Sequence, residues 1–394
     1  MVMPKCYKVA LFLETSRYYG RELTNGIIRY SRLFGPWSFY RDDQFYMTST
    51  KKDDLSYLKR WGVDGIVARD FKGAISLLDL GVPIVSARNL GYLDTQVQIR
   101  TEDESIGKMA FQHFYKKGFK EFAFCGFSNM PWSMKRQAGF DQSVIQHEFA
   151  THILNTPSSG RMLRRNAEYT KLAKWLEKLP KPIGIFCCND DRGYDIIESC
   201  HMADLKVPYD IAVLGVDNDN QICETSNPPL SSVFLSVEKA GFETASCLHK
   251  LMMGEKIDFY EIVVNPVNII ERHSTDIMAI EDESITAALQ YIHEHSRKLI
   301  QAKDVSSAIG VSRRSLEGKF QLVLGHSVFH EIRRSRVETI CKLLIETDMT
   351  ITDIALMLGY NDSDHIARFF KKEKRITPKH FRNTYGLKKR YTNQ

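Results

Sequence analysis

The chain has 394 residues, of which 43% are hydrophobic and 26% are charged, and its formal net charge is +6. A chain of this length predicts two or three domains, each large enough to bury a core of its own. It contains no run of about eighteen apolar residues and no basic-then-apolar leader, so we expect neither a membrane span nor a secretory signal.

The eight cysteines do not show the spacing of a zinc site or a CxxC pair. Most of them lie inside apolar segments, where a cysteine is typically a buried, reduced thiol. Reduced thiols are typical of the cytoplasm. We therefore expect a cytoplasmic protein that binds no metal and no other cofactor.

In residues 5–275, short apolar runs alternate with amphipathic segments, a pattern typical of parallel strands buried on both faces. The predicted strands are Val9–Leu13, Gly65–Ala68, Pro83–Ser86, Phe122–Phe127, Ile183–Cys188 and Ile211–Val216. They fall into two groups, roughly residues 5–112 and 118–235, which predicts two doubly wound lobes joined by a hinge. We expect residues 236–272, including the strand-like Ile262–Ile270, to return to the first lobe.

In doubly wound folds, ligands bind beyond the carboxyl ends of the strands. Each predicted strand here is followed by carboxylate, amide, guanidinium or aromatic side chains. The ligand-binding candidates are Glu14, Tyr18, Tyr19, Asp70, Arg88, Trp132, Arg136, Asn189, Asp190 and Asp217. Such groups hydrogen-bond the hydroxyls of a sugar, and an aromatic ring packs on its C–H face. For Asp190 and Asp217, a role as a helix cap is an equally good interpretation.

This part of the chain resembles the LacI family and the periplasmic sugar-binding proteins. The similar features are Asn189-Asp190 after one strand, Gly215-Val216-Asp217-Asn218 after the next, and Arg136 with Gly139 on a helix. The resemblance implies a two-lobed periplasmic-binding-protein-like domain with two parallel sheets and a small sugar as effector. It also nominates Arg136, Asn189, Asp190 and Asp217 as effector contacts.

Residues 304–372 contain one pattern twice. Each copy has a short apolar helix, a glycine turn and a second helix with a polar start, which is the pattern of a helix-turn-helix. The turn residues Gly310 and Gly359 are 49 positions apart, whereas Leu316 and Ile366 are 50 apart, so the second turn is one residue longer. We therefore predict an all-helical domain with two helix-turn-helix motifs.

A predicted helix with a single apolar stripe joins the two copies. The stripe consists of Val328, Ile332, Val337, Ile340, Leu343 and Leu344. A helix of about twenty residues is roughly 30 Å long, close to the roughly 34 Å between successive major-groove faces of DNA. The helix could thus space two reading heads on adjacent turns of the groove. The same stripe is what the core of a helical domain requires, and both interpretations can hold.

The C-terminal part resembles the AraC/XylS family of transcription regulators over about residues 282–387. The resemblance lies in Gly359-Tyr360, Phe369-Phe370-Lys371-Lys372 and Thr377-Pro378-Lys379-His380-Phe381-Arg382. It implies double-stranded operator DNA as a partner. From Glu281 to the end there are 20 Lys+Arg and 14 Asp+Glu, so this part has the whole net charge of +6, as a DNA-binding module requires.

The exposed early turns of the second helix in each copy are expected to face the groove. Ser312 is the predicted N-cap of the first of these helices, and Asn361 or Asp362 that of the second. The DNA-binding candidates are Ser312, Arg313, Arg314, Glu317, Lys319, Ser363, Asp364, His365, Arg368, Lys371 and Lys372. The three lysines are expected to contact phosphate rather than bases. Arg368 could instead pair with Asp364 on the same helix.

The order of the two parts resembles the xylose operon regulators, and Glu271–Asp276 is similar to the connector of that family. We predict domains at residues 1–278 and 279–394, with the boundary in the stretch 276–283. The resemblance implies a sugar-responsive activator of a pentose (xylose-like) operon, a homodimer, and contact with RNA polymerase.

Other functions stay open from the sequence. One is a sugar-responsive repressor, one is an enzyme joined to an AraC-type DNA reader, and one is a sensor half that binds another protein. The strand ends offer no Ser/His/Asp triad and no glycine-rich phosphate loop, so we expect no catalysis. A receiver domain has a single lobe of about 120 residues, which is less than half of this N-terminal part.

Overall fold

The computed structural model describes residues 5–41, 55–69, 74–87, 93–157, 165–277 and 282–385. The chain divides into two compact units, Met1–Ala279 and Ile280–Gln394. The ligand-binding candidates Asp70 and Arg88 lie outside the described residues. Within the described residues, no helix is both long enough and apolar enough to cross a membrane.

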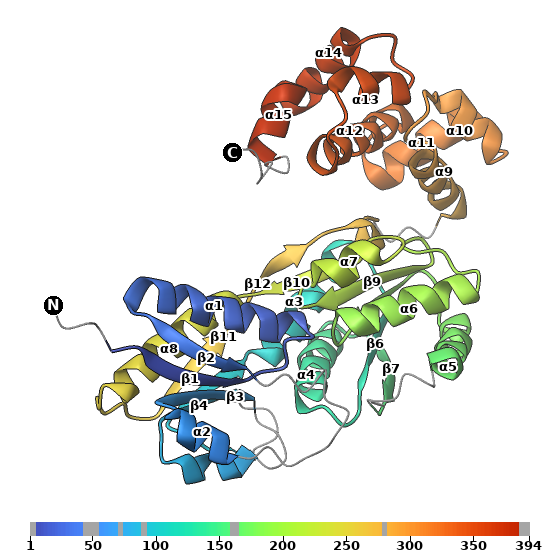
Figure 1. Ribbon diagram of the computed structural model, residues 1–394. Helices are drawn as coiled ribbons and strands as arrows, with labels where there is room; N and C mark the ends of the chain where they lie inside the picture. The colour runs from blue at the N-terminus through green and yellow to red at the C-terminus, as the bar shows by residue number, and fades with distance from the viewer. Residues whose placement is uncertain are drawn as a thin grey trace. The chain divides into compact units, whose positions relative to one another are not determined.

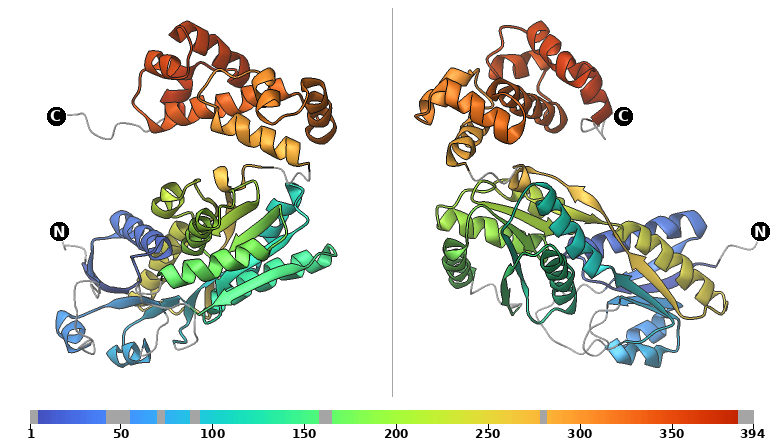
Figure 2. Two further views of the ribbon diagram at one scale, coloured as in Figure 1. Left: turned by 90° about the vertical axis from the view of Figure 1, so that its right-hand side faces the viewer. Right: turned by 180° about the vertical axis from the view of Figure 1, so that it is seen from behind.

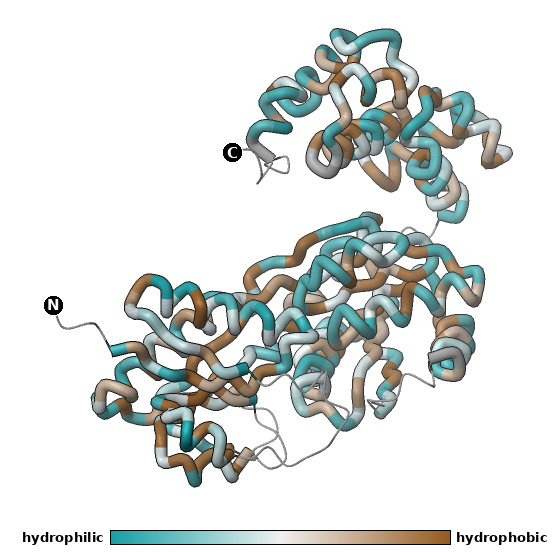
Figure 3. The backbone as a smooth tube through the Cα atoms, in the orientation of Figure 1, coloured by the Kyte–Doolittle hydropathy of each residue, from teal (hydrophilic) through white to brown (hydrophobic). Residues whose placement is uncertain are grey.

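Two sheets, each with six strands among the described residues, form the first unit (Figures 1 and 2). The first sheet has the order β11-β5-β4-β3-β1-β2 and is parallel throughout. Its strands are β1 (Tyr7–Phe12), β2 (Trp37–Arg41), β3 (Gly65–Arg69), β4 (Ile84–Ala87), β5 (Val97–Thr101) and β11 (Tyr260–Val264). Apolar residues dominate the middle of β1, β3 and β4 (Figure 3).

Helices cover both faces of the first sheet. Because successive side chains of a strand point to opposite faces, β1 contributes to two cores. Val9 and Leu11 of β1 share a core with residues of α1 (Tyr18–Phe34) and α8 (Val237–Met252). Ala10 and Phe12 share a second core with residues of α2 (Leu55–Trp61) and the 3₁₀ helix η2 (Ala74–Leu80). This two-sided burial explains why β1, β3 and β4 appear in the sequence as continuous apolar runs.

The second sheet has the order β12-β10-β9-β8-β6-β7. Its strands are β6 (Phe122–Phe127), β7 (Thr151–Thr156), β8 (Ile183–Cys187), β9 (Ile211–Val216), β10 (Ser231–Leu235) and β12 (Pro266–Ile270). Phe122 and Phe124 of β6 share a core with α3 (Asp103–Lys116) and α4 (Pro131–Gln146). Ala123 and Cys125 share another with α5 (Arg165–Lys178) and α6 (Asp190–Met202).

Three short connections cross between the sheets, at Glu102, Ser236 and Asn265. They lie side by side: the Glu102 N–H donates to the Val264 carbonyl oxygen (3.0 Å), and the Asn265 N–H donates to Ser236 Oγ (3.0 Å). The predicted return of residues 236–272 to the first lobe is confirmed for α8 and β11 and is wrong for β12. That strand pairs antiparallel with β10 in the second sheet. One residue separates β11 from β12, so the two appear in the sequence as one run.

The second unit is helical throughout its described elements. Its helices are α9 (Glu283–Glu294), α10 (Ala302–Ala308), α11 (Arg313–Leu324), α12 (Val328–Glu346), α13 (Ile351–Met357), α14 (Ser363–Lys374) and α15 (Pro378–Tyr385). Val328 and Ile332 at the start of α12 pack with α9, α10 and α11. Val337 and Ile340, further along α12, pack with α13 and α14. The predicted spacer helix therefore belongs to the cores of both helix-turn-helix motifs.

Candidate functional site

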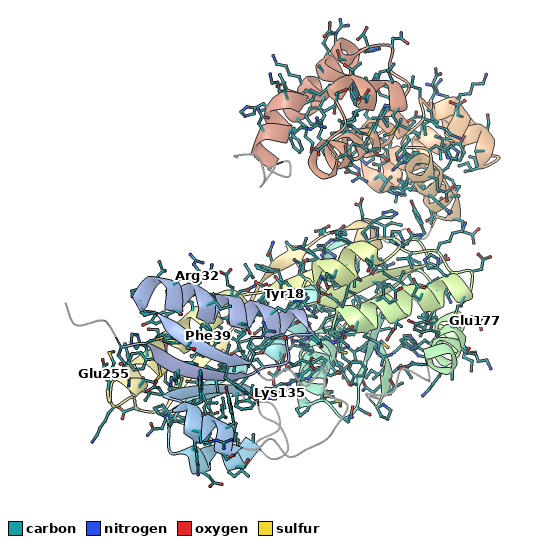
Figure 4. The ribbon with its side chains drawn as sticks, in the orientation of Figure 1. Tyr18, Arg32, Phe39, Lys135, Glu177 and Glu255 are labelled. Carbon is teal, nitrogen blue, oxygen red and sulfur yellow. The ribbon has the colours of Figure 1, made fainter. Side chains whose placement is uncertain are left out.

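A cavity of about 350 Å³ in the first unit is lined by strand ends of both sheets. This volume is within the range typical of small-molecule sites. The predicted ligand-binding residues that line it are Glu14, Tyr18, Tyr19, Trp132, Arg136, Asn189, Asp190 and Asp217. Arg69 and Ala87, which directly precede Asp70 and Arg88, line it as well. Figure 4 labels two lining residues, Tyr18 on α1 and Lys135 on α4, in the middle of the unit.

Arg136 is the buried cation of the cavity. Its Nε donates to Asp103 Oδ1 (3.0 Å) and its Nη1 donates to the carbonyl oxygen of Cys188 (2.6 Å). Its Nη2 lies 3.8 Å from Asp217 Oδ1, and its guanidinium lies 4.9 Å from the centre of the Trp132 ring. Burial raises the pKa of Asp103, whereas Arg136 favours its charged form. Arg136 thus forms a hydrogen-bonded ion pair with Asp103, whereas its distance to Asp217 is too long for a hydrogen bond.

Asp217 differs from the other carboxylates of the cavity in its backbone conformation and in its hydrogen bonding. Its backbone φ is 104°, a conformation that costs a non-glycine residue free energy and is typical of functional positions. Its Oδ1 is buried and has no hydrogen-bond partner among the described residues. Burial raises the pKa of Asp217 to about 6, although Arg136 lowers it. Its carboxylate can therefore accept hydrogen bonds from a ligand hydroxyl.

Asp190 lines the same cavity, but both of its carboxylate oxygens have partners within the protein. Oδ1 accepts from Ser232 Oγ (2.6 Å), and Oδ2 accepts from the backbone N–H of Asp219 (2.7 Å). Burial raises the pKa of Asp190 well above its ordinary value. A side chain at Gly215 would place its Cβ 2.2 Å from Asp190 Oδ1. Asp190 thus fixes the loop that contains Asp217.

The helix caps next to these residues differ from the two that the sequence left open. The N-cap of α6 is Asn189, whose Oδ1 accepts from the Arg192 N–H (3.1 Å), so the helix begins at Asp190. The N-cap of α7 (Asn220–Thr225) is Asp219, two residues after Asp217. Neither Asp190 nor Asp217 is therefore an N-cap of these helices.

Aromatic side chains form the apolar part of the lining. Tyr19 is half-buried, and its hydroxyl lies 3.4 Å from Thr101 Oγ1. Burial raises the pKa values of Tyr18 and Tyr19 to about 12, so both are neutral phenols. Trp132 packs edge-on against Phe127 with ring centres 6.2 Å apart. Glu14 is exposed and accepts a hydrogen bond from Ser16.

Two ion pairs between the lobes, next to the cavity, were not predicted from the sequence. Arg17 Nη1 lies 2.7 Å from Asp191 Oδ1, and Arg21 Nη2 lies 2.6 Å from Asp219 Oδ2. Arg17 is the N-cap of α1 and Arg21 lies in its first turn, whereas both aspartates follow strands of the second sheet. The available signal was the position of Arg17 after the first predicted strand, at the strand end where ligands bind in such folds. These pairs join the lobes around the ligand cavity.

The two helix-turn-helix copies match in burial as well as in sequence. Leu316 and Phe320 of α11 are buried, as are Ile366 and Phe370 at the corresponding places of α14. The turn residues Gly310 and Gly359 have φ values of 69° and 75°, which favour glycine. Most of the predicted DNA-binding residues are exposed: Ser312, Arg313, Arg314, Asp364, His365, Arg368, Lys371 and Lys372. Ser363 is half-buried.

The second helix of each motif, α11 or α14, is capped by the side chain of the residue directly before it. Ser312 Oγ accepts from the Ser315 N–H (3.2 Å), and Asp362 Oδ1 accepts from the His365 N–H (2.7 Å). Of the two predicted caps for α14, the structure selects Asp362 rather than Asn361. Arg368 Nε donates to the backbone oxygen of Asp364 (3.4 Å).

Two predicted DNA contacts have partners inside the second unit. Glu317 Oε2 accepts from the Val328 N–H at the start of α12 (3.2 Å). Lys319 Nζ lies 2.7 Å from Asp282 Oδ2 and donates to Ser284 Oγ (2.7 Å), at the start of α9. These bonds direct both side chains to helix N-termini, which leaves Arg313 and Arg314 as the exposed charged groups of α11.

Comparisons with known proteins agree with this two-unit arrangement. A family model described as a periplasmic binding protein-like domain matches residues 111–275, and one described as a helix-turn-helix domain matches residues 305–384. The xylose operon regulatory protein of Escherichia coli (strain K12) is 29% identical, with 96% of this chain and 97% of that protein covered. The protein of the same name from Haemophilus influenzae is also 29% identical, with 95% and 98% covered.

A solved structure of a xylose-binding transcription activator has a TM-score of 0.79 with this chain at 27% identity, and the match covers 98% of this chain and 100% of that one. The chain is thus similar to xylose operon regulators over nearly its whole length. This similarity confirms the predicted fold, a two-lobed α/β unit followed by a helical unit with two helix-turn-helix motifs. It also confirms the prediction of a DNA-binding transcription regulator.

Proposed function

We propose that this protein binds a small sugar, a pentose such as xylose, in the cavity of the first unit. The observation that carries the proposal is Asp217, a half-buried carboxylate whose buried Oδ1 accepts no hydrogen bond among the described residues, beside Arg136 and the Trp132 ring. Carboxylate and guanidinium groups beside an aromatic ring are suited to sugar hydroxyls and to the sugar's C–H face. The names of the similar proteins support the same ligand.

In this proposal, sugar binding favours the closed arrangement of the two lobes, which Arg17 and Arg21 stabilise by pairing across the cavity. The change of conformation alters how a homodimer binds its operator, and the bound protein activates a pentose operon by contacting RNA polymerase. A protein that binds chromosomal DNA of a bacterium works in the cytoplasm, which is where we place it.

We propose a binding protein rather than an enzyme. An acid–base pair of Asp190 and Asp217 would need free carboxylate oxygens on both, and the two oxygens of Asp190 are already bonded to Ser232 and Asp219. Calorimetric titration of the full chain with D-xylose, other pentoses and hexoses tests the proposal. Heat of binding for one pentose, without turnover of it, is the expected result. Consumption of the sugar, or no heat with any sugar, would contradict it.

For DNA, the expected reading residues are Arg313 and Arg314 on α11 and His365 and Arg368 on α14, all exposed. Replacing Arg314 with alanine should weaken binding to the preferred operator by about 1–3 kcal/mol and relax the preference at one position. The measurement is fluorescence anisotropy against the duplex selected from a random library by the unchanged protein, and against single-base variants of it.

Lys372→Ala is the matched control, because Lys372 is an exposed cation of α14 that we assign to phosphate. It should weaken binding to all duplexes alike and reduce the dependence of affinity on salt. If Arg314→Ala behaves in the same way, Arg314 contacts the DNA backbone and its assignment as a base-reading residue is wrong.

A further inference from the structure

The short helix α7 touches the ligand cavity with its N-terminal end. Its N-cap, Asp219, bonds to Asp190 through the backbone and to Arg21 of α1 through the carboxylate (2.6 Å). Ile222, in its first turn, lines the cavity. Only one residue separates Asp219 from Asp217. Because α7 has six residues, a shift of this loop on ligand binding must shift the helix as a whole.

Arg272 binds the opposite side of the same helix. Its Nε lies 2.6 Å from Glu224 Oε1, and its Nη2 donates to Asn220 Oδ1 (3.1 Å). Its Nη1 donates to the carbonyl oxygen of Leu230, in the loop that follows α7 (3.1 Å). Although its side chain is charged, only 11% of it is exposed. All the donor nitrogens of this guanidinium thus bond to α7 or to the loop that follows it.

Arg272 also lies in the segment that runs out of the first unit. It follows β12 and precedes the 3₁₀ helix η4 (His273–Thr275), and the unit ends at Ala279. The backbone of the segment is bound to the second sheet: the Arg272 N–H donates to Ser231 Oγ (2.8 Å), and Ser231 Oγ donates to the Arg272 carbonyl oxygen (2.9 Å). Ser274 Oγ donates to the Val213 carbonyl oxygen (2.6 Å), and Thr275 Oγ1 donates to Ser231 Oγ (2.8 Å). The Arg272 side chain is therefore the link from this segment to α7.

We infer that Arg272 is a positioning residue that transmits sugar binding from α7 to the segment leading to the DNA-binding unit. The inference rests on the proposed function, because it presupposes that a sugar in the cavity changes DNA binding. Contact of the sugar with Asp217 moves the loop and α7, and Arg272 moves with Glu224 and Asn220. The Arg272 backbone, Ser274 and Thr275 are all bonded to the second sheet, so a movement of α7 reaches the segment as a pull on the Arg272 side chain.

The test uses the full chain, D-xylose as the sugar probe, and a duplex selected from a random library by the unchanged protein. Arg272→Met should keep D-xylose binding by calorimetry and keep the sugar-free affinity for DNA. The change in DNA affinity caused by saturating D-xylose should fall from about 5-fold or more to less than about 2-fold. A residue that served only stability would not alter this ratio while both separate affinities stay normal.

Arg29→Met is the matched control, because Arg29 is an exposed arginine of α1 that pairs with Glu238 on α8, away from α7. If Arg272→Met does not fold, the double variant Asn220→Ala, Glu224→Ala removes the two side-chain bonds between Arg272 and α7 from the α7 side. A full sugar response in the folded variant overturns the inference alone. If the unchanged chain binds D-xylose but shows no response of DNA binding to it, or binds none of the pentoses and hexoses, the proposed function is overturned together with the inference.

Discussion

Replacing Arg136 with methionine should lower the free energy of unfolding of the first unit by about 3–5 kcal/mol at pH 7. The guanidinium is buried, pairs with Asp103, lies near Asp217 and donates to the Cys188 carbonyl oxygen. Methionine keeps part of the packing but leaves two carboxylates without their buried cation. Urea denaturation of the full chain, followed by tryptophan fluorescence, measures the loss.

The loss should shrink at pH 5, and this dependence separates an electrostatic cause from a packing cause. Burial already raises the pKa values of Asp103 and Asp217, and removal of Arg136 raises them further. At acidic pH both groups are then neutral and need no cation. Lys135→Met, one residue away and exposed, is the control and should change stability little. An equal loss at both pH values would mean that Arg136 acts through packing alone.

The central strands of both sheets were predictable because they are buried on both faces. Val9 to Phe12 and Ile211 to Val216 are apolar without interruption, and each segment became a strand. The edge strands β2 and β7 were not predicted, since they are only partly buried and mix polar with apolar residues. β5 was missed for a related reason: Val97–Thr101 reads V-Q-I-R-T, in which Gln98 is buried through hydrogen bonds to Asp94 and Thr95.

The residues around the cavity were predictable from their position after strands, whereas their individual roles were not. Asn189, Asp190 and Asp217 all follow strands and all line the cavity. Only the hydrogen bonds distinguish them: Asn189 caps a helix, Asp190 fixes a loop, and Asp217 keeps a free oxygen. The positive φ of Asp217 has no sequence signal, because it depends on the bonds that Asp190 makes to Ser232 and Asp219.

In the second unit, the repeat was sufficient to predict both motifs and the helix between them. It could not show which charged side chains are used inside the fold. Arg336 of α12 is buried and donates to Tyr360 Oη (2.8 Å), to the Lys298 carbonyl oxygen (2.5 Å) and to the Leu358 carbonyl oxygen. It binds the turn of the second motif to the spacer helix, a structural role for a residue that composition alone would count toward DNA affinity.

Replacing Asp217 with asparagine should stabilise the sugar-free protein and at the same time weaken its binding of sugar. The pKa of Asp217 is about 6 in the folded chain, against an ordinary value of 3.8, because burial disfavours the charge. The folded state therefore holds this proton more tightly than the unfolded state. The resulting contribution to stability is complete below pH 4 and is lost as the pH rises through about 6.

Asparagine carries no charge at any of these pH values. The variant should therefore match the unchanged chain below about pH 4 and exceed its free energy of unfolding by about 1–3 kcal/mol above pH 7. Hydrogen bonds to a charged acceptor are worth about 1 kcal/mol more than those to a neutral one, so the affinity for D-xylose should fall by about fivefold. Urea denaturation across pH and calorimetric titration measure the two effects.

Asp204→Asn is the matched control, because Asp204 also has a positive φ (53°) but is exposed and does not line the cavity. It should leave both measurements unchanged. A gain in stability from Asp217→Asn without a loss of affinity would mean that the charge of Asp217 does not contribute to sugar binding. Equal losses of affinity and stability would mean that its carboxylate supports the fold. Only opposite signs in the two measurements fit a buried charge that is kept for the ligand.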